Sequence, residues 1–168
     1  MDQYKKFFVQ VRFDIEYYQL MLSHYTTIAR IINLVLGVIS CGSLASLFAF
    51  PGAQKILAII LALTQVISAA KPYLPYESRV VELNRILIKF DTLFLDIESD
   101  WNKGNLEGNP GKLTDKEWID KLTGYKKRKA ELQQDCMPND DLPNNKRMSR
   151  HAGELADRYF ESTYGEGF

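Results

Sequence analysis

Two long uncharged stretches dominate the hydrophobic pattern of the chain. Residues 31–50 include no charged side chain, and residues 56–70 form a second uncharged stretch between Lys55 and Lys71. At about 1.5 Å per residue, a helix over the first stretch is about 30 Å long, which is the thickness of a bilayer's hydrocarbon core, and the second is about 23 Å long. The second stretch is shorter than the core, but the long apolar side chains of Lys55 and Lys71 can reach the lipid headgroups. We therefore expect two membrane spans, residues 31–50 and residues 55–71.

Apolar residues also recur every three or four positions on both sides of these spans, which is typical of helices with one buried face. The upstream stripe lies in residues 1–30 and comprises Tyr4, Phe8, Val11, Ile15, Tyr18, Leu22 and Tyr25. The downstream stripe lies in residues 76–101 and comprises Val80, Leu83, Leu87, Phe90, Phe94, Ile97 and Trp101. We expect one helix from near Gln3 to Phe50, a turn at Pro51-Gly52, and breaks at Pro72 and Pro75.

The remaining segment, residues 113–168, predicts a helical tail. A loop rich in Gly and Asn over residues 102–112 ends the preceding helix, and Thr114 with Glu117 has the spacing of a capping box. We expect one helix over residues 115–134, a linker over residues 137–145 and a last helix over residues 146–162.

The predicted fold class is therefore all-α, with residues 1–168 forming a single domain. Two transmembrane helices form a hairpin, their long extensions pair as an antiparallel coiled-coil stalk in the cytoplasm, and two short helices follow. The alternative is a soluble helical bundle with the two apolar helices at its centre, because the second stretch has a length common among buried helices.

The positions of the charged residues are more informative about the topology of the chain than its net charge. The 21 basic and 21 acidic residues cancel, so nothing in the balance favours nucleic acid as a partner. Basic residues flank both spans on the side of the chain ends, which predicts that both termini are cytoplasmic. We expect Cys41, inside the first span, and Cys136, in a polar segment, to stay unpaired.

Catalytic chemistry is poorly supported by the sequence. His24 and His151 lie in polar stretches without cysteine or carboxylate at the spacing of metal ligands, and we expect ordinary surface or packing roles. Gly104, Gly108 and Gly111 lack the Lys-Ser or Lys-Thr of a phosphate-binding loop. The sequence therefore predicts no enzyme, no catalytic residue, no metal and no cofactor.

Polar and small residues inside the spans are the first candidate site. Asn33 and Gln65 carry amides, and Gly37 and Cys41 belong to a ladder of small residues that lets helices approach closely. These residues either pack the hairpin against itself or face sister subunits or a water-filled path, and the sequence favours neither alternative.

The basic run Lys126-Lys127-Arg128-Lys129 is the second candidate site. The ordinary interpretation is a solvated helix face. Anionic lipid headgroups come next, since a membrane lies within reach, and a negatively charged ligand is the third alternative.

The order of parts resembles the SLATT family, the two-transmembrane effector domains associated with bacterial nucleotidyltransferase (SMODS) and SLOG sensor systems. The local resemblance depends on short patterns near both spans and the C-terminus: Tyr17-Tyr18, Tyr25, Tyr76, Leu83, Phe90-Asp91, Leu93, Ala156, Arg158-Tyr159-Phe160 and Tyr164-Gly165. It covers nearly the whole chain, and the family has no catalytic motif to carry over.

The resemblance implies a membrane-disrupting, pore-forming effector of antiphage defence. It would be held inactive until a cyclic nucleotide or an associated sensor or nucleotidyltransferase protein releases it. It would then act as a homo-oligomer in the lipid bilayer of the bacterial inner membrane. Two helices are too few to enclose a pore, so conduction requires several copies. The alternative is a non-conducting membrane scaffold whose coiled-coil stalk docks a cytoplasmic partner.

Overall fold

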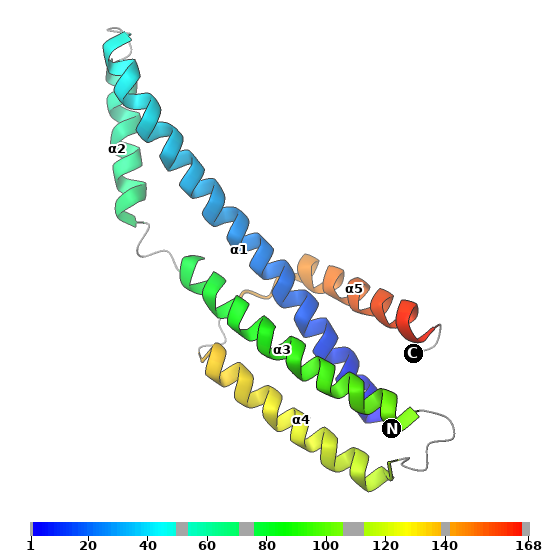
Figure 1. The fold of residues 1–168 in the computed structure, drawn as a ribbon. Coiled ribbons are helices and arrows are strands. Elements are labelled where there is room, and N and C mark those ends of the chain that lie inside the picture. Colours follow the sequence, from blue (N-terminus) through cyan, green and yellow to red (C-terminus); the bar gives the residue numbers. More distant parts are fainter. Residues whose placement is uncertain (1, 50–53, 71–75, 106–112, 139–141, 166–168) are drawn as a thin grey trace. The chain divides into compact units, whose positions relative to one another are not determined.

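The computed structural model describes residues 2–49, 54–70, 76–105, 113–138 and 142–165, and within this part every regular element is an α-helix. In chain order the helices are α1 (Asp2–Ala49), α2 (Gln54–Ala70), α3 (Tyr76–Asn105), α4 (Asp115–Cys136) and α5 (Lys146–Tyr164) (Figure 1). The predicted all-α class is confirmed.

Most helix boundaries agree with the sequence pattern. The capping box at the start of α4 is confirmed, because the hydroxyl of Thr114 accepts from the Glu117 amide and the Glu117 carboxylate accepts from the Thr114 amide. The loop predicted over residues 102–112 begins too early, since α3 continues to Asn105. The predicted turn at Pro51-Gly52 and the breaks at Pro72 and Pro75 lie outside the described residues.

The chain divides into two compact units that are described separately. Unit 1 comprises Met1–Leu22 and Val81–Phe168, and unit 2 comprises Ser23–Val80. Unit 1 therefore holds the first part of α1, most of α3, and all of α4 and α5, whereas unit 2 holds the apolar part of α1 and α2.

The core of unit 1 is formed where α1 and α3 pack in opposite directions. Tyr4 donates its hydroxyl to the carbonyl of Ile97 at 3.1 Å, the Phe8 and Phe94 rings lie 5.0 Å apart, and Tyr18 meets Phe90 at 5.5 Å. The two predicted stripes supply this core, because their members in unit 1 are almost all buried: Tyr4, Phe8, Val11, Ile15, Tyr18, Leu83, Leu87, Phe90, Phe94, Ile97 and Trp101. The pairing of the stripes is thus observed in unit 1.

Helix α4 covers one side of this pair. Trp118 packs with its ring centre 4.4 Å from that of Tyr4 and 6.2 Å from that of Trp101. Tyr125 donates its hydroxyl to Asp100 at 2.8 Å. These contacts join the first half of α4 to the end of α3, so α4 runs antiparallel to α3.

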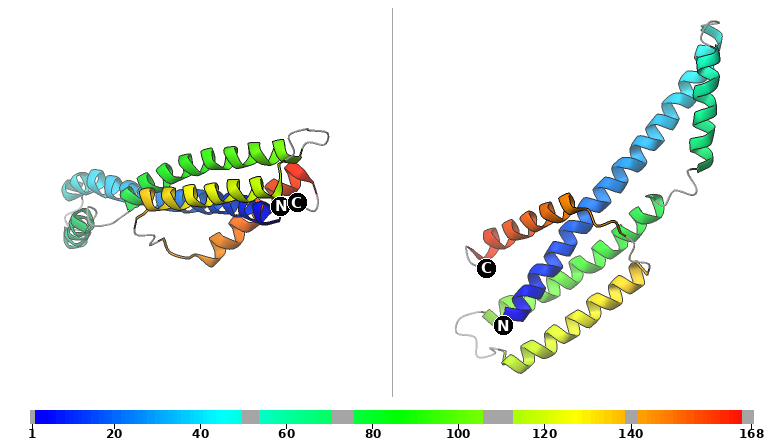
Figure 2. Two further views of the ribbon diagram at one scale, coloured as in Figure 1. Left: turned by 90° about the horizontal axis from the view of Figure 1, so that it is seen from below. Right: turned by 180° about the vertical axis from the view of Figure 1, so that it is seen from behind.

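Helix α5 covers the other side. Its Phe160 meets Phe8 edge to face at 5.0 Å, and Tyr159 meets Phe94 at 5.6 Å. Within unit 1, α4 and α5 therefore lie on either side of the α1–α3 pair (Figure 2). The sequence alone predicts these two helices only as a tail.

In unit 2, the second part of α1 and α2 lie side by side and run in opposite directions (Figures 1 and 2). The Tyr25 ring of α1 lies 6.1 Å from the Tyr76 ring at the start of α3. Thr64 is the buried polar residue of α2, and its hydroxyl donates to the carbonyl of Ile60 in the same helix at 2.8 Å. A threonine bonded in this way satisfies its hydroxyl within its own helix.

Candidate functional site

The apolar surface of unit 2 is the candidate functional site. Among the described residues, α1 is the one helix that is long and apolar enough to cross a membrane by length and composition. Only 6% of its most apolar window is buried, whereas the core helix of a soluble protein is mostly buried. The described apolar part of α2 is shorter, covering Ala58–Ala70.

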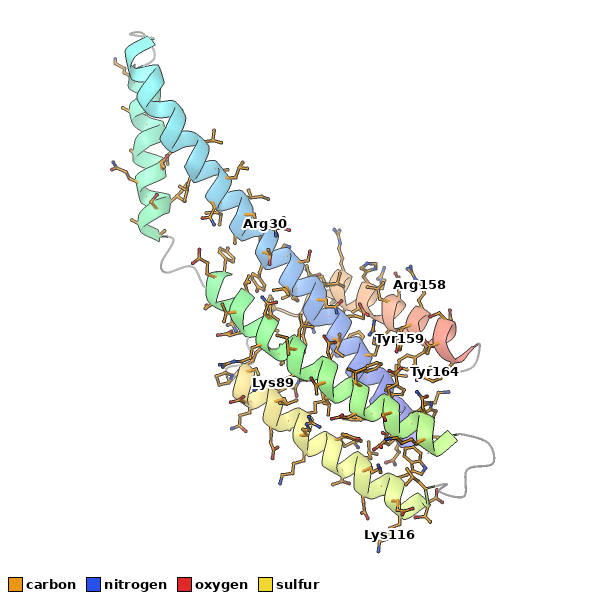
Figure 3. The ribbon with its side chains drawn as sticks, viewed as in Figure 1. Arg30, Lys89, Lys116, Arg158, Tyr159 and Tyr164 are labelled. Atoms are coloured by element: carbon orange, nitrogen blue, oxygen red, sulfur yellow. The ribbon has the colours of Figure 1, made fainter. Side chains whose placement is uncertain are left out.

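The large aliphatic side chains of this surface are exposed. They come from both helices of unit 2: Ile31, Leu34, Val35 and Val38 in α1, and Ile59, Ile60, Leu63, Val66 and Ile67 in α2. A contiguous apolar surface of this kind marks contact with a membrane or a protein partner. Arg30 precedes it on α1 and is exposed (Figure 3).

The structure places the predicted polar residues of the spans on this surface. Asn33 on α1 and Gln65 on α2 are exposed. Gly37 is also exposed, and a Cβ added there would meet nothing within 4 Å. Cys41 belongs to α1, but its side chain lies outside the described part. Asn33, Gly37 and Gln65 are thus exposed side by side with the aliphatic residues of unit 2.

The basic run of α4 is divided by its ion pairs. Arg128 binds Asp96 at 2.6 Å, and Lys129 pairs with Asp14 while lying 5.8 Å from the centre of the Phe7 ring. Lys126 and Lys127 are exposed, the latter 3.8 Å from Glu131. Arg128 and Lys129 therefore connect α4 to α3 and α1, whereas Lys126 and Lys127 have no ion pair with another helix among the described residues.

A polar cluster between α1, α3 and α5 was not anticipated from the sequence. Arg12 pairs with Glu16 one turn later, and its guanidinium carbon lies 4.1 Å from the centre of the Tyr159 ring. Glu16 is only 7% exposed. On the other side of Tyr159, one oxygen of Glu98 accepts the hydroxyl of Tyr159 at 2.6 Å and that of Tyr164 at 3.0 Å.

Burial and hydrogen bonding both raise the pKa of these two phenols. Partial burial, followed by the hydrogen bond to Glu98, raises the pKa of Tyr159 to about 12, and the same two causes raise the pKa of Tyr164. Both hydroxyls point from α5 toward α3, whereas Arg158 on the same helix is exposed (Figure 3). The spacing of Arg12 and Glu16, one helical turn apart, was the available sequence signal.

The cluster borders a shallow groove of about 680 Å³ that is lined by Arg12, Glu16, Leu155, Arg158, Tyr159, Glu161 and Ser162. Two arginines and two glutamates make its charge balanced. Within the described residues no group of three or more His, Cys, Asp or Glu side chains could hold a metal ion. His24 and His151 are both exposed, and Cys136 is buried as a free thiol.

Comparison of the chain with protein-family models, curated proteins and solved structures found no match.

Proposed function

We propose that this protein is a membrane-disrupting effector of a bacterial antiphage defence system. A nucleotide second messenger or a partner sensor triggers it, and it acts by oligomerising in the inner membrane, with both termini in the cytoplasm. The observation that carries the proposal is the exposure of the large aliphatic side chains of unit 2, because water is a poor solvent for such a surface and lipid is a good one.

The placement of the polar residues supports assembly of several copies. The exposed amides of Asn33 and Gln65 are costly in hydrocarbon unless they meet another polar group. Gly37 leaves room on the surface of α1 for the close approach of another helix. A second copy can supply both the polar partners and the approaching helix.

The trigger is proposed to act on unit 1. Lys126 and Lys127 remain exposed on α4 and provide two cations that an anionic messenger or an acidic partner can contact. The resemblance to the SLATT effectors favours a messenger made by an associated nucleotidyltransferase.

Dye release from liposomes tests the proposal. The full chain, reconstituted in vesicles of phosphatidylethanolamine and phosphatidylglycerol, should release an enclosed dye with a steep dependence on the protein-to-lipid ratio. Intact vesicles at every ratio, together with tight binding of a cytoplasmic protein, would instead support the non-conducting scaffold.

A pair of lysine variants controls for insertion. Leu63→Lys places a charge in the middle of α2 and costs about 2.5–3.5 kcal/mol in the bilayer centre, so release should fall. Ile119→Lys changes an equally exposed residue of α4 in unit 1 and should leave release unchanged. Equal release from both variants would contradict the assignment of unit 2 to the membrane.

A further inference from the structure

Helix α3 carries an apolar row on its outer face. Val81, Ile88 and Leu95 are 68%, 70% and 61% exposed, although the opposite face of the same helix forms the core of unit 1. A helix at the surface of a bundle normally has one apolar stripe and a polar outer face. The α3 helix departs from this rule, which indicates that its outer face is covered in the working state.

The spacing of the row fits a partner helix. Its members are seven residues apart, and seven residues return almost to the same line along an α-helix, with a drift of only about 20°. A row of this kind can contact a second helix along its whole length, with each of its three residues forming one layer of the contact. We name Val81, Ile88 and Leu95 the α3 row.

We propose that the α3 row is a self-association surface, at which α3 of a second copy packs parallel and in register so that each row residue meets its counterpart. The inference rests on the proposed function for the common orientation of the copies, because chains inserted in one membrane with the same topology present α3 in the same direction.

The charges beside the row favour the parallel arrangement. Arg85 lies three residues before Ile88 and Asp91 three residues after it, so the two exposed side chains flank the row on opposite sides, each about 60° from Ile88 around the helix. When two parallel helices face each other, the Arg85 side of one adjoins the Asp91 side of the other. In an antiparallel pair, the Arg85 sides of the two helices would adjoin each other, and so would the Asp91 sides. Like charges would then meet.

Charges farther around the helix are already paired within unit 1. Lys89 pairs with Asp135 of α4, and Asp96 binds Arg128 of α4 at 2.6 Å (Figure 3). On the side toward α5, Glu98 accepts the hydroxyls of Tyr159 and Tyr164. Arg85 and Asp91 are exposed charged residues that border the row. Each also interacts electrostatically within unit 1, Arg85 with Asp135 and Asp91 with Arg12.

Disulfide cross-linking tests both the surface and its direction. The full chain, with Cys41→Ala and Cys136→Ala, receives one new cysteine at a time: Val81→Cys, Ile88→Cys or Leu95→Cys. In oxidised membranes all three should give covalent dimers, because a parallel pair brings identical residues together. Ile119→Cys, which replaces an equally exposed residue of α4, is the control and should stay monomeric.

The alternatives give different patterns. Cross-linking at Ile88→Cys alone would indicate an antiparallel pair and overturn the proposal, as would equal cross-linking of Ile119→Cys or no dimer at all. Arg85→Glu should weaken the Ile88→Cys cross-link about threefold, and adding Asp91→Arg should restore it. Failure of the double variant to recover would show that the two charges do not adjoin.

Dye release measured on the same variants separates this inference from the proposed function. If the chain cross-links as expected but never releases dye, the α3 row is a self-association surface and the proposed membrane-disrupting function is wrong. If the chain releases dye but does not cross-link at the α3 row, the proposed function stands and the self-association surface is wrong.

Discussion

The guanidinium of Arg12 lies 4.1 Å from the centre of the Tyr159 ring, and so joins α1 to α5 across the side of unit 1. The same group pairs with Glu16, while its Nε is buried without a hydrogen-bond partner among the described residues. Arg12 therefore neutralises a nearly buried carboxylate and holds the aromatic face of α5. A planar, permanently charged group suits both tasks.

Replacing Arg12 should destabilise unit 1. Arg12→Leu removes the cation over Tyr159 and leaves Glu16 without its counter-charge, so we expect the free energy of unfolding to fall by about 2–3 kcal/mol. Both tryptophans, Trp101 and Trp118, are buried in unit 1, so their fluorescence during urea titration of the full chain in detergent reports this unit.

Arg158→Leu is the matched control, because Arg158 lines the same groove but is exposed. It should change the free energy of unfolding by less than about 0.5 kcal/mol. Equal losses for the two variants would show that the Arg12 cluster has no special role in stability.

Two glycines of unit 1 should respond in opposite directions to alanine. A Cβ at Gly104 would lie 2.2 Å from the Trp118 ring, which is itself packed between Tyr4 and Trp101, so Gly104→Ala should cost about 1–3 kcal/mol. Gly124 lies inside α4 with nothing within 4 Å of the added Cβ, so Gly124→Ala should stabilise by about 0.5–1 kcal/mol. The tryptophan fluorescence assay measures both, and stabilisation by Gly104→Ala would contradict the observed contact.

Acid should weaken unit 1 through Asp100. Partial burial raises the pKa of this carboxyl, but hydrogen bonds from Lys121 and Tyr125 and the charge of Lys121 outweigh burial and hold the pKa below its ordinary value of 3.8. A group with a lowered pKa in the folded state stabilises above its unfolded pKa, and this stability is lost as the pH falls through the folded pKa.

Asp100→Asn removes this pH-dependent contribution. The variant should be less stable than the parent near pH 6, and the difference should shrink as the pH falls from about 4 through the lower folded pKa. Urea titrations at a series of pH values measure it. A stability difference that is constant over this range would show that the Asp100 charge is not the cause.

Cysteine labelling tests the proposed topology. In a chain without native cysteines, Lys55→Cys at the start of α2 should react with a membrane-impermeant maleimide added outside the inner membrane. Lys116→Cys, exposed on α4, should react only after the cells are lysed (Figure 3). Labelling of Lys55→Cys only after lysis would contradict a hairpin that crosses the membrane twice.

The exposed amides of unit 2 should matter for leakage. Asn33→Leu or Gln65→Leu removes a polar contact worth about 1 kcal/mol between helices in lipid, so dye release at a fixed protein-to-lipid ratio should fall severalfold. Thr64→Val is the control, since the buried Thr64 hydroxyl bonds within its own helix. Unchanged release from both leucine variants would mean that these amides face neither a sister subunit nor a water-filled path.

Local signals in the sequence predicted the helices well. The stripe from Tyr4 to Tyr18 and its counterpart from Leu83 to Trp101 are buried against each other, because periodicity records which face of a helix avoids water. The capping box placed the start of α4 correctly, since both of its bonds join residues three apart. The end of α3 was misplaced because Gly104 suggested a loop, whereas it gives room to Trp118.

Contacts between distant segments were the part that the sequence could not supply. Nothing local connects Arg12 to Tyr159, or Lys129 to Asp14, and each pair depends on how the helices pack. For the same reason the sequence could not show that Arg128 and Lys129 pair with Asp96 and Asp14. Two spans, the proposed function and the roles of Asn33 and Gln65 stay predictions.

Hydrogen bonds of tyrosine hydroxyls hold both ends of α5 in place. The hydroxyl of Tyr17 donates to the carbonyl of Pro143 at 2.8 Å and accepts from the Asn145 amide at 3.3 Å, just ahead of α5. At the far end a single oxygen of Glu98 holds Tyr159 and Tyr164. One phenol therefore holds the start of α5 and one carboxylate holds its last turns, and undocking of α5 would expose the side of Phe8 that Phe160 and Tyr164 cover.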